Sequence, residues 1–393
     1  MSTGCSGHEE ASMIYLDNNA TTRPLPAVVA AVAEALNGHW ANPSSKHPAG
    51  QEARRLLTEA RAEVARLLGA QPAEVVFTAS ATEANAMALH AALAVPDAPR
   101  RLVLSAIEHA GLQQVAKALA GEGVEVLILP VDTHGVIVTA ALPALLADGA
   151  AVVSVMAANN ETGVIQPVAE VVRLARAAGV PVHVDATQMA GRLPVDCAAL
   201  GARFMSVSAH KLHGPKGIGA LVVKKGAPFA PLLPGQQERK RRGGTENLPG
   251  IAGFAAAARH ALASLSGAEG LHMAALRDAL EAGLAAVLPN VRVFGAGVPR
   301  LPNTSCVAFG SLDAEVVLQR LERAGICASS GSACSAGGTE ASHVLLAMGV
   351  EESAARGAVR FSLSADTTPG DIATVIQILQ AALTPLLAEV LTA

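Results

Sequence analysis

Short apolar runs alternate with amphipathic helical segments between about residues 50 and 225, and this alternation limits the possible folds more than any other feature of the chain. Apolar residues recur at helical spacing in segments such as Gln51–Leu68 and Val168–Ala178. The runs between such segments are β-branched and almost continuously apolar, which is typical of parallel strands buried on both faces. We therefore predict an α/β protein with a mostly parallel seven-stranded sheet. The expected strands are Val75–Phe77, Arg101–Leu104, Val124–Leu129, Ala151–Val155, Val180–Val184, Phe204–Val207 and Gly219–Val223.

The length of the chain and one polar interruption of its pattern predict two domains. A chain of 393 residues is long enough for two, at roughly 150 residues each. The polar and charged stretch Gly235–Pro249 predicts a loop, and the sequence closes with an amphipathic helix at Pro369–Leu391. We predict a large domain over residues 13–264 and a smaller C-terminal α+β domain over residues 265–393, which the N-terminal arm 1–20 joins.

The composition predicts a well-packed globular protein. Hydrophobic residues make up 51% of the chain and charged residues 16%, as in a protein with a large core. The net charge of −4 provides no basic field for nucleic-acid binding. There is no run of about 18 consecutive apolar residues and no secretory signal in the first dozen residues, so we expect no membrane partner and a cytoplasmic location. Five cysteines without CxxC spacing suit free thiols in a reducing compartment and predict no metal site for catalysis.

A carboxylate and a lysine follow two successive strands. Asp185 ends the apolar run Val182–Val184, and Lys211 lies after the next strand, in the Ser-, His- and Gly-rich loop Ser208–Gly217. A lone loop lysine is usually only solvated. A carboxylate, a strand and then a lysine are what a pyridoxal phosphate (PLP) site requires, because the lysine forms the Schiff base and the carboxylate keeps the pyridinium nitrogen protonated.

A phosphate site is expected where another strand meets a helix. The segment Phe77–Asn85 ends a strand and opens a helix, and helix N-termini bind phosphate through their free N–H groups. The main chain at Ala81 and the Thr82 hydroxyl are the candidate donors.

Cys334 lies in the small-residue segment Ala328–Gly338. Such a segment has little apolar area to bury, so we expect the loop 328–342 to be mobile. This suggests a thiol that travels. Cys197 and Cys306, in apolar surroundings, are expected to be core residues.

Several motifs together resemble the cysteine desulfurases, which belong to the class V group of fold-type I PLP enzymes. The resemblance covers roughly residues 13 to 365. Asp17–Thr22 and the Cys334 loop look closest to the NifS branch, which serves nitrogenase maturation, and next closest to the housekeeping IscS branch. The motifs are Tyr15–Thr22, Asn42–His47, Asn159–Gln166, Ser208–Lys211 and Ser329–Cys334.

The resemblance implies a role for each matching residue. Lys211 would be the Schiff-base lysine and the base at the substrate Cα, and Cys334 the nucleophile that takes the sulfur. Arg360 would clamp the substrate carboxylate; an arginine between Val359 and Phe361 in a buried strand also needs an anionic partner. The other implied contacts are His109 over the ring and in proton transfer, Asn160, Asp185 and Gln188 around the ring and substrate, Ala81, Thr82, Ser208 and His210 at the phosphate, and Thr245 reaching the phosphate of the neighbouring subunit in a homodimer.

The implied reaction converts L-cysteine into L-alanine and leaves a persulfide on Cys334. The sulfur would pass to an Fe–S scaffold protein of the NifU or IscU type, with Cys334 contacting the nascent cluster. Three alternatives stay open: a housekeeping IscS-type desulfurase, a selenocysteine lyase, and a catalytically idle partner subunit. The retained Lys211, Asp185 and Cys334 argue against the idle subunit, and Cys334 argues against an aminotransferase on the same scaffold.

One position departs from the resemblance. Relatives usually have a glycine in the phosphate turn where this chain has Ser80. We therefore predict that the turn does not require a positive φ at this residue, or that it is slightly strained there.

Overall fold

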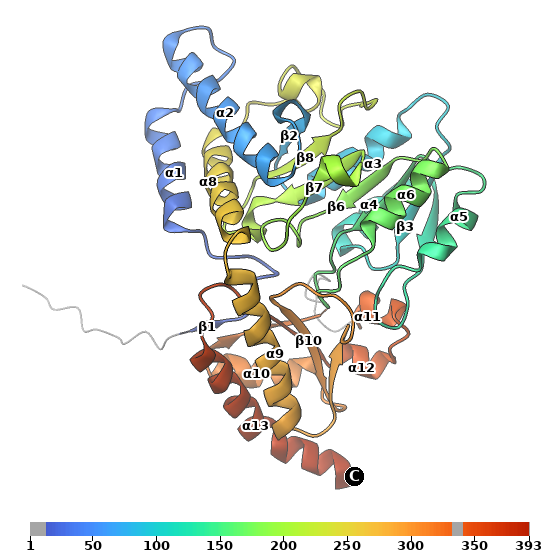
Figure 1. The fold of residues 1–393 in the computed structure, drawn as a ribbon, viewed down its shortest axis with the longest axis vertical. Helices are drawn as coiled ribbons and strands as arrows, with labels where there is room; N and C mark the ends of the chain where they lie inside the picture. Colours follow the sequence, from blue (N-terminus) through green and yellow to red (C-terminus); the bar gives the residue numbers. More distant parts are fainter. Residues whose placement is uncertain (1–12, 332–340, 393) are drawn as a thin grey trace, which may run out of the picture.

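A seven-stranded sheet forms the centre of the upper part of the molecule in Figure 1. The computed structural model describes residues 13–331 and 341–392. The strands are β2 (Val75–Thr78), β3 (Arg101–Ser105), β4 (Glu125–Leu129), β5 (Val152–Met156), β6 (Val182–Asp185), β7 (Phe204–Ser208) and β8 (Gly219–Val223). Their order is β2-β8-β7-β6-β5-β3-β4. Neighbours are parallel from β4 to β7, whereas β8 is antiparallel to both β7 and β2. The predicted mostly parallel seven-stranded sheet is confirmed.

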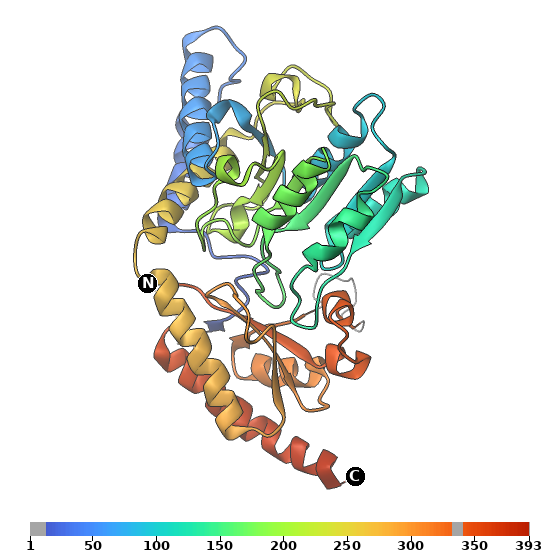
Figure 2. The ribbon, with the colours of Figure 1, turned by 45° about the vertical axis from the view of Figure 1, so that its right-hand side comes forward.

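Both faces of this sheet are covered by helices (Figure 2). Successive side chains of a strand point to opposite faces. In β2, Val75 and Phe77 therefore belong to one hydrophobic cluster and Val76 to another. Burial on both sides explains why the strands are almost continuously apolar. The first cluster is covered by α2 (Pro48–Leu67), α5 (Leu142–Leu145), α6 (Val168–Ala177) and α8 (Leu248–Leu265), and the second by α3 (Ala81–Leu93) and α4 (Ala110–Gly121).

A second, antiparallel sheet forms the centre of the lower part of the molecule (Figure 1). Its strands, in spatial order, are β12 (Ser329–Ser330), β13 (Ala358–Ser362), β10 (Thr304–Phe309) and β9 (Val291–Phe294). Helices α9 (Glu269–Val287), α10 (Ala314–Arg323) and α13 (Pro369–Thr392) contribute to its hydrophobic core. The chain crosses between the two parts between α8 and α9, and the domain boundary at residue 264 stays a prediction.

The N-terminal arm lies against the lower part, although it begins the chain. Strand β1 (Ile14–Tyr15) pairs in parallel with β11 (Ile326–Cys327). Asp17 then forms an isolated β-bridge with Ser362 of β13. From there the arm runs toward the seven-stranded sheet. The remaining elements are α1 (Pro26–Gly38), α7 (Cys197–Leu200), α11 (His343–Ala347) and α12 (Glu352–Arg356), with 3-10 turns at Pro72–Glu74, Thr139–Ala141, Ala209–Lys211 and Glu238–Lys240.

Helix α13 carries the longest apolar stretch of the described chain. Within residues 13–331 and 341–392, its segment Pro369–Ala388 is the one helix with the length and hydropathy of a membrane span, at a mean hydropathy of 1.5. Ile372, Val375, Leu379 and Leu383 of this helix are buried in the core of the lower part. Because core helices pass the same test of length and composition, the stretch is weak evidence for a span.

Candidate active site

The carboxyl ends of the strands β2, β3, β5, β6 and β7 meet at a cavity of about 200 Å³. Active sites of such sheets lie at this edge, and most of the predicted site residues are brought together there. A larger cavity of about 700 Å³ lies around α6 and α7, but no lysine lines it. The predicted residues that line the smaller cavity are Ala81, Thr82, His109, Asn160, Asp185, Gln188, Ser208, His210 and Lys211.

Asp185 is held rigidly at the end of β6. Its Oδ2 accepts a hydrogen bond of 2.8 Å from the Asn85 side-chain amide, and its Oδ1 accepts one of 2.9 Å from the Thr187 N–H. Sequence reasoning assigned no role to Asn85. It lies three residues after Thr82, on the same face of α3, and this helical spacing was the signal that could have identified it. The two bonds fix the carboxylate in the cavity wall.

His109 caps the N-terminus of α4. Its Nδ1 accepts a hydrogen bond of 3.0 Å from the Gly111 N–H, so the neutral ring carries its proton on Nε2. Burial lowers the pKa of His109; the Asp185 charge opposes this shift, and the Lys211 and Arg360 charges lower the pKa further. The imidazole is therefore neutral near pH 7 and offers Nε2–H to a partner.

The predicted phosphate turn has a conformation that a serine at position 80 can adopt. Ser80 is extended, with φ −167° and ψ 169°, and its Oγ accepts a hydrogen bond from the Glu83 N–H at the start of α3. The prediction that no positive φ is needed is confirmed. Gly219 of β8 allows a close approach here, because an added Cβ would lie 2.8 Å from the Ser80 carbonyl carbon and 3.1 Å from the Ala81 nitrogen.

Several polar atoms of the cavity wall are buried without a hydrogen-bond partner in the described chain. They include Ser208 Oγ, Thr187 Oγ1 and Asn160 Oδ1. A buried polar group without a partner costs about 1–3 kcal/mol, so these atoms fit a polar ligand. Burial, followed by the charges of Lys211 and Lys216, lowers the pKa of the adjoining His210 to about 4. Together with Lys211 and Asp185, this wall fits PLP.

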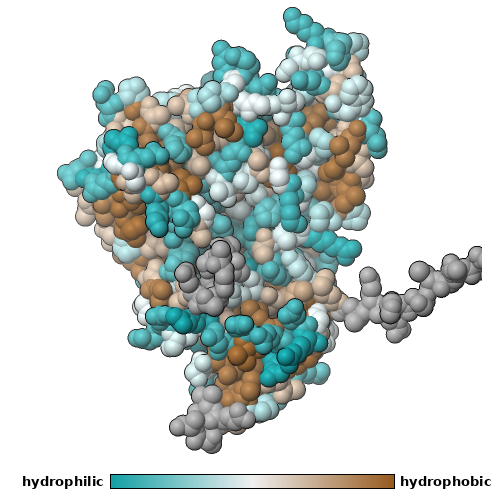
Figure 3. Space-filling model, turned by 180° about the vertical axis from the view of Figure 1, so that it is seen from behind, coloured by the Kyte–Doolittle hydropathy of each residue, from teal (hydrophilic) through white to brown (hydrophobic). Residues whose placement is uncertain are grey.

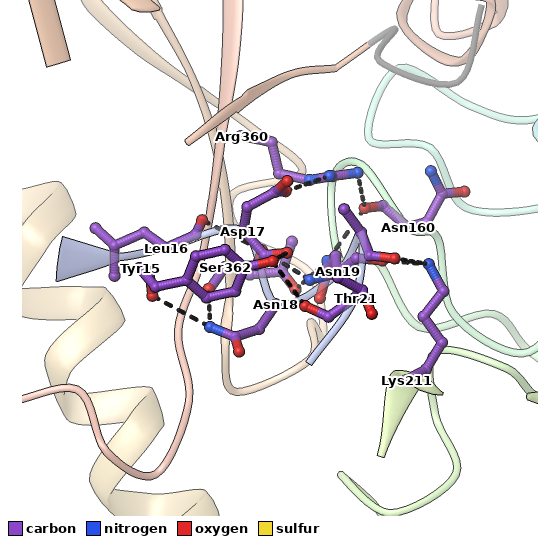
Figure 4. Close-up of polar contacts among 12 residues, drawn as sticks. Tyr15, Leu16, Asp17, Asn18, Asn19, Thr21, Asn160, Lys211, Arg360 and Ser362 are labelled. Carbon is purple, nitrogen blue, oxygen red and sulfur yellow. Dashed lines mark hydrogen bonds and ion pairs between the residues drawn. The ribbon is translucent and has the colours of Figure 1, made fainter. Parts of the chain in front are cut away.

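Lys211 and Arg360 are both held by the N-terminal arm (Figure 4). Lys211 Nζ donates hydrogen bonds to the carbonyl oxygens of Asn19 (2.5 Å) and Ala20 (2.9 Å). Arg360 lies on β13 with 2% of its side chain exposed, and its Nη2 forms an ion pair of 2.8 Å with Asp17 Oδ1. The sequence argument expected an anion beside Arg360. The chain itself supplies one through Asp17, so the role of Arg360 in substrate binding stays a prediction.

Two of the predicted residues that the structure describes, Arg360 and Thr245, do not line the cavity with Lys211. Thr245 lines a separate cavity of about 270 Å³, with Ala79, Gly217 and Arg242 among its neighbours. The contact of Thr245 with the phosphate of a neighbouring subunit stays a prediction. Cys334 lies outside the described residues.

Cys197, Cys306 and His183 have structural surroundings. Cys197 and Cys306 are buried, as expected. Burial raises the pKa of the Cys197 thiol to about 12 and that of Cys306 still higher, so neither is a nucleophile. His183 lies between the hydroxyls of Ser154 and Ser206, with both ring nitrogens 2.8 Å from an Oγ.

Two buried carboxyl groups near the cavity were not anticipated from the sequence. Glu108 accepts hydrogen bonds from the Ser105 hydroxyl and the Met156 N–H, and burial raises its pKa to about 8. Glu161 accepts a hydrogen bond of 2.5 Å from the Ser342 hydroxyl, and burial raises its pKa to about 7. Among the described residues, no group of three or more His, Cys, Asp or Glu side chains is placed to hold a metal ion.

The fold and the cavity together define a PLP enzyme, and comparison with known proteins supplies the family. The sequence profile of the class V aminotransferases matches residues 14–375. The chain is 46% identical to a cysteine desulfurase of Cereibacter sphaeroides, over 93% of this chain and 94% of that protein. It is 43% identical to the cysteine desulfurase NifS of Azotobacter vinelandii, over 93% and 91%. A solved NifS-like protein superposes with a TM-score of 0.87 at 35% identity, over 95% and 99%.

The chain therefore belongs to the PLP-dependent cysteine desulfurases of the class V aminotransferase family, and the predicted resemblance is confirmed.

Proposed function

We propose that this protein removes sulfur from L-cysteine, releases L-alanine and keeps the sulfur as a persulfide on Cys334. The observation that carries the proposal is the single cavity that joins Lys211, Asp185 and His109. The relatives named cysteine desulfurase support the choice of substrate.

Different residues of the cavity would hold different parts of PLP. Lys211 would anchor it, and Asp185, which accepts a hydrogen bond from the Asn85 amide, would pair with the ring nitrogen. The N-terminus of α3 at Ala81 and Thr82, with Ser208 and His210, would bind the phosphate. Asn160 and Gln188 would hydrogen-bond around the ring and the substrate. When bound, the cofactor supplies an electron sink that makes the substrate Cα proton acidic and weakens the Cβ–Sγ bond.

Lys211 and His109 move the protons. The Lys211 amine takes the Cα proton, and the neutral His109 ring donates and recovers a proton at Nε2. Arg360 binds the substrate carboxylate. Asn160, Asp185, Gln188 and Ser208 in the cavity wall are buried, and this low-dielectric surrounding strengthens each of these interactions.

Cys334 receives the sulfur. Its thiolate attacks the substrate sulfur and forms an S–S bond, while the Cβ–Sγ bond breaks and leaves its electron pair on the three-carbon fragment. That fragment takes up a proton and leaves as L-alanine, so no external oxidant is needed. An ordinary cysteine has a pKa of about 8.5, and positive charges such as those of Lys211 and Arg360 would favour the Cys334 thiolate once it reaches the substrate sulfur.

We propose that the sulfur is delivered to an Fe–S scaffold protein in the cytoplasm, in the manner of the NifS branch. The similarity to the NifS of Azotobacter vinelandii and the Asp17–Thr22 motif support this assignment. The IscS-type housekeeping role is the alternative, since other relatives carry only the general name.

A homodimer with Thr245 completing the neighbouring site is part of the same proposal. Helix α1 packs against α8 and leaves Val29 and Leu36 58% and 59% exposed, and Trp40, just after the helix, is 77% exposed. Figure 3 shows further apolar patches among polar surface on the face opposite that of Figure 1. Such exposed apolar residues suit a subunit interface.

The test is to incubate the PLP-loaded protein with L-cysteine, to measure L-alanine, and to map sulfur by mass spectrometry. We expect one L-alanine per sulfur released, with a persulfide on Cys334. Cys334→Ser should bind PLP and form no persulfide, whereas the control Cys327→Ser should behave like the unchanged protein. Full activity in Cys334→Ser would refute the assigned nucleophile, and a preference for L-selenocysteine would favour the lyase.

A further inference from the structure

The Asp17–Arg360 pair occupies the position where a substrate carboxylate is expected. Arg360 is almost completely buried, and its Nη1 also donates to the carbonyl oxygen of Asn160 at 3.1 Å. Its Nε is buried without a partner in the described chain. The guanidinium therefore already holds one anion and has a donor left over.

Asp17 is held in this place by the main chain around it. It forms a β-bridge with Ser362, and the next residue but one, Asn19, donates its side-chain amide to the carbonyl oxygen of Asn160 at 3.1 Å. The arm is therefore anchored on both sides of Arg360, as Figure 4 shows. The Asp17 side chain is 21% exposed, so it lies at the boundary between Arg360 and solvent.

We propose that Asp17 is a specificity-determining residue that competes with the ligand carboxylate for Arg360. This inference rests on the proposed role of Arg360 in substrate binding. A carboxylate that reaches Arg360 must share it with Asp17 or displace Asp17, and both are opposed by the repulsion between two anions. A carboxylate without an amino group gains only its contact with Arg360. An α-amino acid also bonds through its amino group at the cofactor, so it overcomes the repulsion. The pair thus selects amino acids against carboxylates that have no amino group.

The test removes the charge of Asp17 and measures the binding of propionate, a carboxylate without an amino group. Because Asp17→Asn removes the repulsion between two neighbouring anions, it should tighten propionate binding by about tenfold, the equivalent of about 1.4 kcal/mol. Isothermal titration calorimetry on the PLP-loaded protein gives the dissociation constant directly, without relying on turnover. Propionate should also become a stronger competitor of L-cysteine.

Three matched variants make the result specific. Asp17→Glu keeps the charge and should bind propionate as weakly as the unchanged protein. Asp148→Asn removes a carboxylate from an arginine pair at the surface, 3.3 Å from Arg101 and 82% exposed, and should change nothing. In the Asp17→Asn background, Arg360→Lys should weaken propionate binding again.

Unchanged or weaker propionate binding in a folded Asp17→Asn protein would overturn the proposal, as would tight binding that persists in the Arg360→Lys double variant. Circular dichroism of each variant establishes that it is folded. Failure of the proposed desulfurase function has a different signature, because the unchanged protein would then form no L-alanine from L-cysteine whatever its affinity for propionate.

Discussion

Replacing Arg61 with methionine should destabilise the protein by about 3–5 kcal/mol, because it leaves the Glu238 carboxylate buried without its cation. Arg61 Nη1 and Nη2 lie 2.5 and 2.7 Å from the two Glu238 carboxylate oxygens. The side chains are 7% and 2% exposed. Glu238 also accepts a hydrogen bond of 2.9 Å from the Phe77 N–H, and Arg61 donates one of 2.8 Å to the Val75 carbonyl oxygen. The pair therefore ties α2 and the Glu238 turn to β2.

The size of the effect follows from what remains after the substitution. Glu238 would keep one of the three hydrogen bonds described here, and the Val75 carbonyl oxygen would lose its arginine donor. A loss of about 3–5 kcal/mol is a large part of the total stability of a protein, about 5–15 kcal/mol. The double variant Arg61→Met with Glu238→Gln removes the buried charge as well and should recover much of this loss.

Urea unfolding followed by circular dichroism measures these free energies. The control is Arg173→Met, which breaks another bidentate pair, with Glu170 at 2.6 and 2.7 Å, but at side chains 64% and 41% exposed. It should cost less than about 1 kcal/mol. Equal costs for Arg61→Met and Arg173→Met, or a double variant no more stable than Arg61→Met, would refute the reasoning.

Three further predictions concern the site and its surroundings. Asn85→Ala removes the amide donor to Asp185 and should weaken PLP binding by about tenfold, the equivalent of one hydrogen bond to a charged group; the visible absorbance retained after dialysis measures this, and full retention would contradict it. Burial lowers the pKa of His183 to about 4, whereas an unfolded histidine titrates near about 6.5. The unfolded chain therefore binds the proton first, and stability should fall by up to about 3 kcal/mol as the pH drops from 6.5 to 4; His183→Gln should show a shallower loss in urea unfolding at pH 7 and pH 5. Cys197 and Cys306 should resist iodoacetamide in the folded protein, and rapid labelling of either, detected by mass spectrometry, would contradict their raised thiol pKa.

The sequence predicted those parts of the site that follow from local order along the chain. Asp185 and Lys211 each follow a strand, and Thr82 stands at a helix start, so the topology of a parallel sheet brings them to one edge. Each of these inferences needs only a strand, its end and the next few residues.

Pairs between distant segments could not be predicted in this way. Asp17 and Arg360 are 343 positions apart, and Arg61 and Glu238 are 177 apart. The charged stretch that contains Glu238 predicts a loop, yet Glu238 is buried and faces Arg61. Whether a charged side chain can be buried depends on the partner that packing brings to it. The sequence around one member of such a pair does not indicate the other member.

The N-terminal arm has a consequence for the order in which the protein matures. The arm is translated before the seven-stranded sheet, but its partners Ser362 and Arg360 are translated after that sheet. Contacts of such long sequence separation form late, because a long loop must close before they are made. The upper sheet and Lys211 are therefore synthesised well before Asp17 and Asn19 can take up their places between the two parts. A nascent chain halted before β13 would have the strands of the seven-stranded sheet but an open site, so completion of the active site awaits the synthesis of β13.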